Sequence, residues 1–194
     1  MKLYAFRDIA RSSPNPTFLP SQVDIDAGLT NISHANFQTD FSFHDAVSNL
    51  LNTLRDAHTR YVKPDCYANF IWRLNPPVSF SSVLMNGQQV IMLNDPTGNL
   101  NGRMVTQING LPAVKALFDW GVRVGRDSLD LGTRFNQALK AFSARPLATY
   151  GIPESAGVDL TFYGSSSPVT LPWVAYSARD RYRCSQQSLQ KSQY

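Results

Sequence analysis

The sequence predicts an α+β fold in which an N-terminal helical segment precedes a β-rich domain with two helices. One observation is a single amphipathic helical pattern before Pro64, and another is a series of short apolar runs with turn residues after it. The third is composition, because 43% of the 194 residues are hydrophobic and 16% are charged, with 11 glycines and 12 prolines. These proportions are typical of a globular protein with many turns and argue against a long bundle or coiled coil.

The clearest helical pattern extends from Asp40 to Val62. Asp40 or Ser42 is the expected N-cap, and Pro64 prevents the helix from continuing. Residues 1–24 contain several prolines and are expected to form an extended lead-in. Apolar side chains recur at steps of three and four and form one buried stripe: Phe43, Val47, Leu50, Leu51, Leu54 and Ala57.

After Pro64 the pattern changes to short strands. The apolar runs SSVLM and QQVIML lie on either side of Asn86-Gly87. This arrangement predicts a β-hairpin, because Asn and Gly both tolerate the positive φ of a type I′ turn. The other expected elements are a helical turn over 23–33, strands over 68–74 and 103–108, an Asn109-Gly110 turn, a short helix from Pro112 to Phe118, a helix over Ser128–Phe142, and strands over 158–163 and 168–176.

Charge and cysteine content exclude several classes of function. The net charge of +4 comes from 18 Lys and Arg against 14 Asp and Glu, and no basic run suits nucleic acid. Cys66 and Cys184 lie far apart, without metal-ligand spacing, so two free thiols are expected and their pairing stays open. The sequence has no apolar run of about 18 residues and no signal-peptide core, so no membrane partner is expected.

Two segments resemble one peptidase family. LRDAHTRYV (54–62) resembles the L-x-D-x-H-T motif that precedes the PDZ-like domain of tail-specific (carboxyl-terminal processing) serine peptidases. VTQINGLPAVKAL (105–117) resembles the strand, Asn-Gly turn and helix of that domain. YAFRDIARSSP, FHDAV, DCYANF and VTLPW further resemble the fungal branch related to the chlamydial secreted protease, so the likeness covers roughly residues 4–176.

The resemblance implies three parts. Residues 1–64 are the lead-in and helical segment, 65–176 are the PDZ-like domain, and 177–194 are a disordered basic tail. Relatives continue into a catalytic αβ domain, which this chain is expected to lack. They are also secreted, whereas no signal peptide is recognised here, so localisation stays open.

The resemblance makes His58 the candidate general base. An exposed histidine at a helix C-terminus is the alternative interpretation. Asp56 is expected to bond within the helix end or loop and to point away from His58 if the helix persists, while His34 and His44 are expected on the surface. Ser155 lies in a Pro-containing turn and lacks a nucleophile motif, so it is not a catalytic candidate.

The predicted function is therefore the N-terminal and PDZ-like portion of a serine-type endopeptidase, inactive alone because the nucleophile is absent. No metal or organic cofactor is expected. Expected partners are a peptide or protein bound in a groove between the Ser79–Leu84 strand and the Ser128–Phe142 helix, and a separate catalytic domain. A stand-alone interaction module and a truncated gene product are the alternatives.

Overall fold

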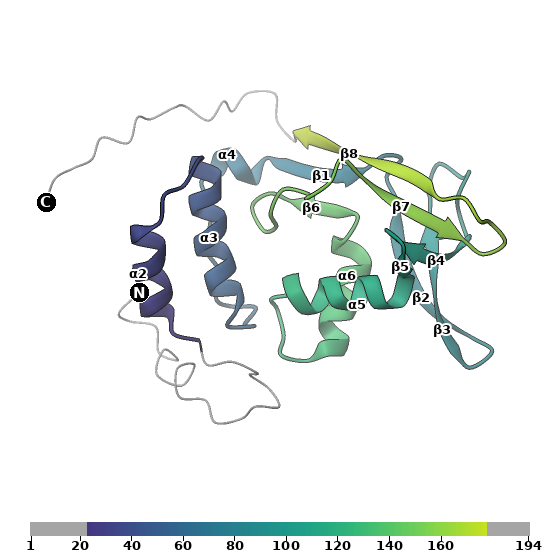
Figure 1. Cartoon of the computed structure of the whole chain (residues 1–194), viewed down its shortest axis with the longest axis horizontal. Helices are drawn as coiled ribbons and strands as arrows, with labels where there is room; N and C mark the ends of the chain where they lie inside the picture. Colours follow the sequence, from purple (N-terminus) through teal and green to yellow (C-terminus); the bar gives the residue numbers. More distant parts are fainter. Residues whose placement is uncertain (1–22, 178–194) are drawn as a thin grey trace, which may run out of the picture.

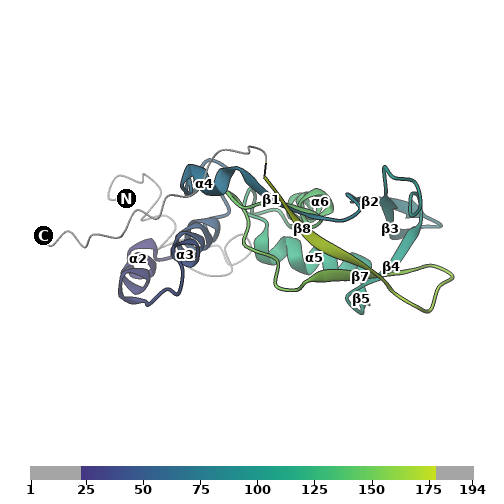
Figure 2. The same ribbon diagram turned by 90° about the horizontal axis from the view of Figure 1, so that it is seen from above.

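The computed structural model describes residues 23–177 and has an α+β fold, as predicted (Figure 1). Its helices are α2 (Ile25–His34), α3 (Asp40–Asn52), α4 (Asp65–Ala68), α5 (Ala113–Val124) and α6 (Leu131–Ala141). Its strands are β1 (Phe70–Leu74), β2 (Ser79–Met85), β3 (Gln88–Asn94), β4 (Met104–Ile108), β5 (Leu111–Pro112), β6 (Ala144–Pro146), β7 (Gly157–Phe162) and β8 (Val169–Ser177). Helices α2 and α3 lie side by side at the end of the molecule opposite the β2–β3 hairpin (Figures 1 and 2).

The strands form one sheet in the order β2-β3-β4-β7-β8-β1-β6, with β5 paired to β4. All of these pairings are antiparallel. Helix α6 packs against both β2 and β6, which are the two ends of the strand order, and against α5. The sheet is therefore strongly curved and nearly barrel-shaped, with α6 spanning its two edges.

The predicted hairpin is confirmed. Asn86 has φ of 50° and Gly87 has φ of 78°, and Met85 pairs with Gln88 on either side of them. Asn109 and Gly110 repeat the same pair of positive φ angles between β4 and β5. Both turns thus use residues that tolerate the left-handed region.

The main core lies between the sheet and the two helices α5 and α6. Gly121 of α5 lets the two helices approach closely, because a Cβ there would lie 2.7 Å from the carbonyl oxygen of Arg134. Apolar side chains of this core that have no exposed surface include Leu74, Ile91, Leu93, Leu117, Ala138 and Leu160.

A second, smaller cluster of buried residues joins α2 to the end of α3. It contains Val23, Ile25, Leu51 and Leu54, with Leu29 and Tyr61 packed against them. This cluster is separate from the main core. The division of the chain at residue 64 remains a prediction.

Helix α3 ends earlier than the sequence predicted. It begins at N-cap Thr39, which forms a capping box with Ser42, and its last residue is Asn52. The Thr53 hydroxyl then donates to the Leu50 carbonyl oxygen at 2.6 Å, and Arg55 adopts φ of 54°, which no helix allows. The predicted helix from Asp40 to Val62 is therefore wrong beyond Asn52, because the backbone leaves the helical conformation by Arg55.

Other boundaries shift for local reasons. Helix α5 continues well beyond Phe118, and α6 begins at N-cap Asp130 rather than at Ser128.

Cys66 is disulfide-bonded, so the expectation of a free thiol is wrong for this residue. The expected tail, most of the expected lead-in and Cys184 fall in 1–22 and 178–194, outside the described residues.

Candidate functional site

The predicted base His58 lies on a tight turn after α3. Its backbone N–H donates to Asp56 Oδ1 at 3.0 Å, and the Thr59 hydroxyl donates to Asp56 Oδ2 at 2.6 Å. These hydrogen bonds, that of Thr59 most of all, lower the pKa of the Asp56 carboxyl below its usual value of 3.8. Asp56 thus remains ionised and fixes the turn.

The His58 side chain is 97% exposed. Its Nδ1 lies 3.3 Å from Asp56 Oδ1, and Nε2 contacts no other polar group in the described part of the chain. Asp56 bonds within the loop as predicted, but it does not point away from His58. The reason is the early end of α3, which turns both side chains to the same side of the turn.

Arg55 anchors the His58 turn to the rest of the fold. Its guanidinium donates to the carbonyl oxygens of Gly125 and, at 3.1 Å, of Val122, at the C-terminal end of α5. Arg134 donates to the same Val122 oxygen at 3.0 Å. Burial, and then repulsion by the charge of Arg134, lowers the pKa of Arg55. The helix dipole favours cations at the C-terminal end of α5. Sequence patterns could not reveal this contact between distant segments.

Ser155 lies in the turn before β7, as expected. Its hydroxyl donates to the Gly157 carbonyl oxygen at 2.7 Å. No hydrogen bond connects it to His58. Ser155 is therefore a turn serine in this structure.

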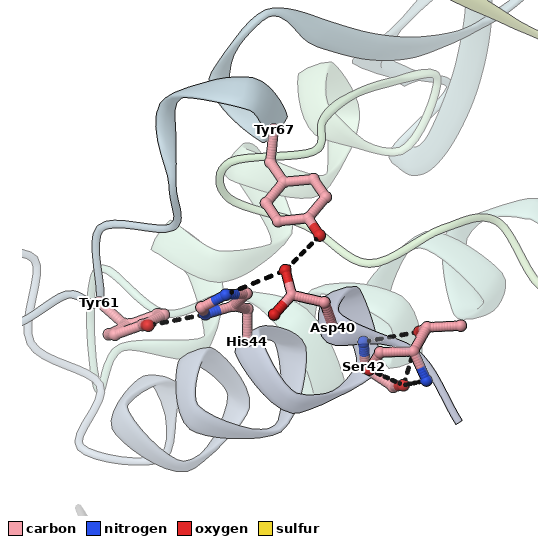
Figure 3. A network of polar contacts seen from close by, with 6 residues as sticks. Asp40, Ser42, His44, Tyr61 and Tyr67 are labelled. Carbon is pink, nitrogen blue, oxygen red and sulfur yellow. Dashed lines mark hydrogen bonds and ion pairs between the residues drawn. The ribbon is translucent and has the colours of Figure 1, made fainter. Parts of the chain in front are cut away.

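His44 lies in a polar network that the sequence did not predict. The structure contradicts its expected surface position, because its side chain is only 12% exposed. Nδ1 is 2.7 Å from the Tyr61 hydroxyl, and Nε2 is 3.3 Å from Asp40 Oδ2, which also accepts a 2.7 Å bond from the Tyr67 hydroxyl (Figure 3). The network thus joins α3, the following loop and α4. His34, in contrast, is exposed in the last turn of α2.

Both tyrosines of this network are held in the neutral form. Burial and then the hydrogen bond to Asp40 raise the pKa of Tyr67 to about 12. Burial, followed by the Asp40 charge, also raises the pKa of Tyr61. A phenolate nucleophile is disfavoured here, and the contacts of the network connect α3, the following loop and α4. In the sequence, the only sign of this network is that Asp40 and His44 are four residues apart, which places them on one face of a helix.

A buried lysine connects α3 to the loop after β6. The Lys63 side chain has no exposed surface, and its Nζ donates to Asp45 Oδ1 at 2.8 Å and to the Leu147 carbonyl oxygen at 3.0 Å. The ammonium also lies 4.6 Å from the centre of the Phe41 ring. Nothing in the local sequence distinguishes this lysine from a surface residue.

Comparison with solved structures identifies the fold. Mature CPAF in complex with lactacystin matches with a TM-score of 0.59 at 14% identity, and mature CPAF alone matches with 0.60 at 12%. A serine-to-alanine mutant of CPAF gives 0.60 at 13%. The described residues have the fold of part of CPAF. The matches cover 86% of this chain but only 31–32% of the CPAF chains, so this chain spans about a third of their length.

CPAF is a chlamydial protease, so the resemblance found in the sequence is confirmed at the level of the fold. No protein-family model matches the sequence, and no curated protein matches it. The fungal branch and the PDZ-like character stay predictions. Within residues 23–177, no helix is long and apolar enough to cross a membrane, and no group of three His, Cys, Asp or Glu side chains could hold a metal ion.

Proposed function

We propose that this chain is the N-terminal and PDZ-like portion of a tail-specific serine endopeptidase, with His58 as the general base. The observation that carries the proposal is the His58 turn, which presents an imidazole nitrogen to solvent on a loop fixed by Asp56 and Arg55. The fold shared with CPAF supports it. An exposed surface histidine needs no such support on both sides of its turn.

The geometry suits proton transfer. A general base needs one free nitrogen for the nucleophile's proton and a partner that fixes the ring's tautomer. In this turn Asp56 Oδ1 lies 3.3 Å from Nδ1. A proton on Nδ1 that is donated to this carboxylate would leave Nε2 to accept one from a hydroxyl. The ionised Asp56 would also stabilise the imidazolium that forms. The hydroxyl itself must come from a further domain, as it does in the family that the sequence resembles.

The test supplies a catalytic domain, from CPAF, in trans or by fusion after β8, and measures hydrolysis of casein. We expect His58→Ala to abolish the hydrolysis that the combined protein performs, and His34→Ala, another exposed histidine, to leave it unchanged. The NMR signals of the His58 ring should shift when the domain binds. Full activity of the His58→Ala protein would contradict the proposal.

A second candidate is a peptide-binding module. Strand β2 is at the end of the strand order and exposes Val83, Leu84 and Met85. An edge strand beside a helix is the arrangement in which extended peptides add as a further strand, and α6 packs against β2. Binding should change the backbone N–H signals of β2, and a proline at Ser82 should weaken it. Signals that stay constant with extended peptides would exclude this function.

A further inference from the structure

A pocket of about 470 Å³ lies where α3 meets α5 and the loop after β6. Its volume is in the range of small-ligand sites. Its apolar side chains include Phe41, Trp120, Tyr150 and Ile152. A smaller hollow of about 100 Å³ adjoins it and shares Trp120, Arg123, Arg145 and Glu154. None of these residues takes part in the function proposed above. The inference that follows is therefore independent of that function.

Arg145 lines both hollows, and aromatic rings surround it. Its guanidinium carbon lies 4.4 Å from the centre of the Trp173 ring and 5.2 Å from those of Trp120 and Phe142. Nε donates to the Phe142 carbonyl oxygen at 3.0 Å, which fixes the plane of the group. In the described residues no hydrogen bond or ion pair engages the two terminal nitrogens, so the fork of donors is available.

The carboxylates of the pocket are already paired with other cations. Glu154 accepts a 2.7 Å bond from Arg123 at the exposed rim, and Asp45 pairs with Lys63 at 2.8 Å. Neither of these carboxylates forms an ion pair with Arg145. Burial, and then the charge of Arg123, lowers its pKa to about 10, although the charges of Glu154 and Tyr150 act in the opposite direction. A bound anion would offset the free-energy cost of burying the Arg145 charge without an ion-pair partner.

We propose that the pocket binds a carboxylate that carries an apolar group. The carboxylate takes the two terminal nitrogens of Arg145 as a bidentate pair, and the apolar group packs against Trp120 and Tyr150. A singly charged carboxylate fits better than a phosphate, because Glu154 and Asp45 repel a second negative charge. The carboxylate can belong to a small organic acid or to the end of a peptide.

The test uses hexanoate, with hexanamide as its neutral match. NMR follows the Nε–H of Arg145 and the indole N–H of Trp120, with both molecules added to the whole chain. We expect saturable shifts with hexanoate and about tenfold weaker binding of hexanamide, since a charge-assisted pair exceeds a neutral hydrogen bond by roughly 1.4 kcal/mol. Equal binding of the two molecules would overturn the proposal.

Three variants locate the site. Arg145→Met and Arg145→Lys should each weaken hexanoate binding about tenfold, the second because lysine keeps the charge but lacks the planar fork. Arg103→Met is the matched control, because Arg103 lies 4.1 Å from the Phe162 ring centre but lines neither hollow. If Arg145→Met fails to fold, Arg145→Lys decides. Unchanged binding in that variant overturns the proposal.

A last experiment tests whether the bound carboxylate belongs to a small organic acid or to the end of a peptide. Acetyl-Leu-Leu is compared with hexanoate and with the same dipeptide as its amide. Tighter binding of the dipeptide acid supports the end of a peptide as ligand, and tighter binding of hexanoate supports a small organic acid. If neither acid displaces the other, the two do not share the Arg145 fork and the proposal fails.

Discussion

Tyr67 shows how a single residue responds to its surroundings. Its pKa is raised from 10.0 to about 12 by burial and by the hydrogen bond to Asp40. A raised pKa means that the folded state holds the proton more tightly than the unfolded state. The stability that Tyr67 contributes is therefore fully present below about pH 10 and is lost as the pH rises towards 12.

Asp40→Asn tests this account. Removing the carboxylate charge should lower the pKa of Tyr67 from about 12 towards 10.0, although burial keeps it above that value. The measurement is an alkaline titration of labelled tyrosine by NMR, with Tyr67→Phe to assign the signal. A Tyr67 pKa that is the same with and without Asp40 would show that the network does not couple the two groups.

What the sequence could predict about single residues depends on how far away their partners lie. His58 has polar neighbours, so its exposure follows from local composition. His44 stands between Phe43 and Asp45, and it is largely buried because Tyr61 and Tyr67 arrive from later segments. Arg145 likewise gave no signal, since the rings that surround it come from α5, α6 and β8.

At the scale of elements, turn chemistry was the most reliable guide. The Asn86-Gly87 hairpin was predicted because the turn residues themselves dictate the backbone. The end of α3 was missed because its apolar spacing continues to Leu54 and Ala57, while the Arg55 contact with α5 reverses the chain. Strand β6 has only three residues, which is too short for any period to show.

The packing of α5 on α6 yields a prediction for Gly121→Ala. The added Cβ would lie 2.7 Å from the Arg134 carbonyl oxygen, which is backbone and cannot move aside alone. We expect a loss of about 1–3 kcal/mol in the free energy of unfolding, measured by urea denaturation. Gly132→Ala is the control, because its Cβ meets only the Asp130 side chain at 3.3 Å. Similar losses in both variants would contradict the close approach at Gly121.

The link between α3 and the loop after β6 makes a further prediction. Lys63→Met leaves Asp45 without its cation and removes the bond to the Leu147 oxygen. The variant should lose about 3 kcal/mol of unfolding free energy, as when one partner of a buried pair is removed. Lys140→Met, at an exposed position of α6, should change it by less than about 0.5 kcal/mol. If the two variants are equally stable, Lys63 does not hold these elements together.

For the whole molecule, the order of the longer helices and strands could be predicted, without α4, β5 and β6, but their assembly could not. No local pattern indicated that β1 pairs with β8 and β6, or that α6 spans the edge strands. Such pairings depend on contacts far apart in the chain, which local patterns do not encode. The CPAF likeness at 12–14% identity shows that this arrangement tolerates extensive change in sequence.

The arrangement of the whole chain also predicts its behaviour in solution. Nucleophilic catalysis needs a hydroxyl in hydrogen-bond contact with its base, and in the described residues His58 bonds to Asp56 and to no serine. The Ser155 hydroxyl donates to the Gly157 carbonyl oxygen instead. In the purified chain, the serines of residues 23–177 should therefore neither support hydrolysis of casein nor react with a fluorophosphonate.

Mass spectrometry after fluorophosphonate treatment provides the measurement, with Ser155→Ala as the comparison. The same treatment of the protein combined with a catalytic domain should label a serine of that domain and none of this chain. Labelling of Ser155 in the chain alone would mean that its bond to Gly157 opens and that a base reaches it. In that case His58 would have to move from its turn, and the anchoring by Asp56 and Arg55 described above would be wrong.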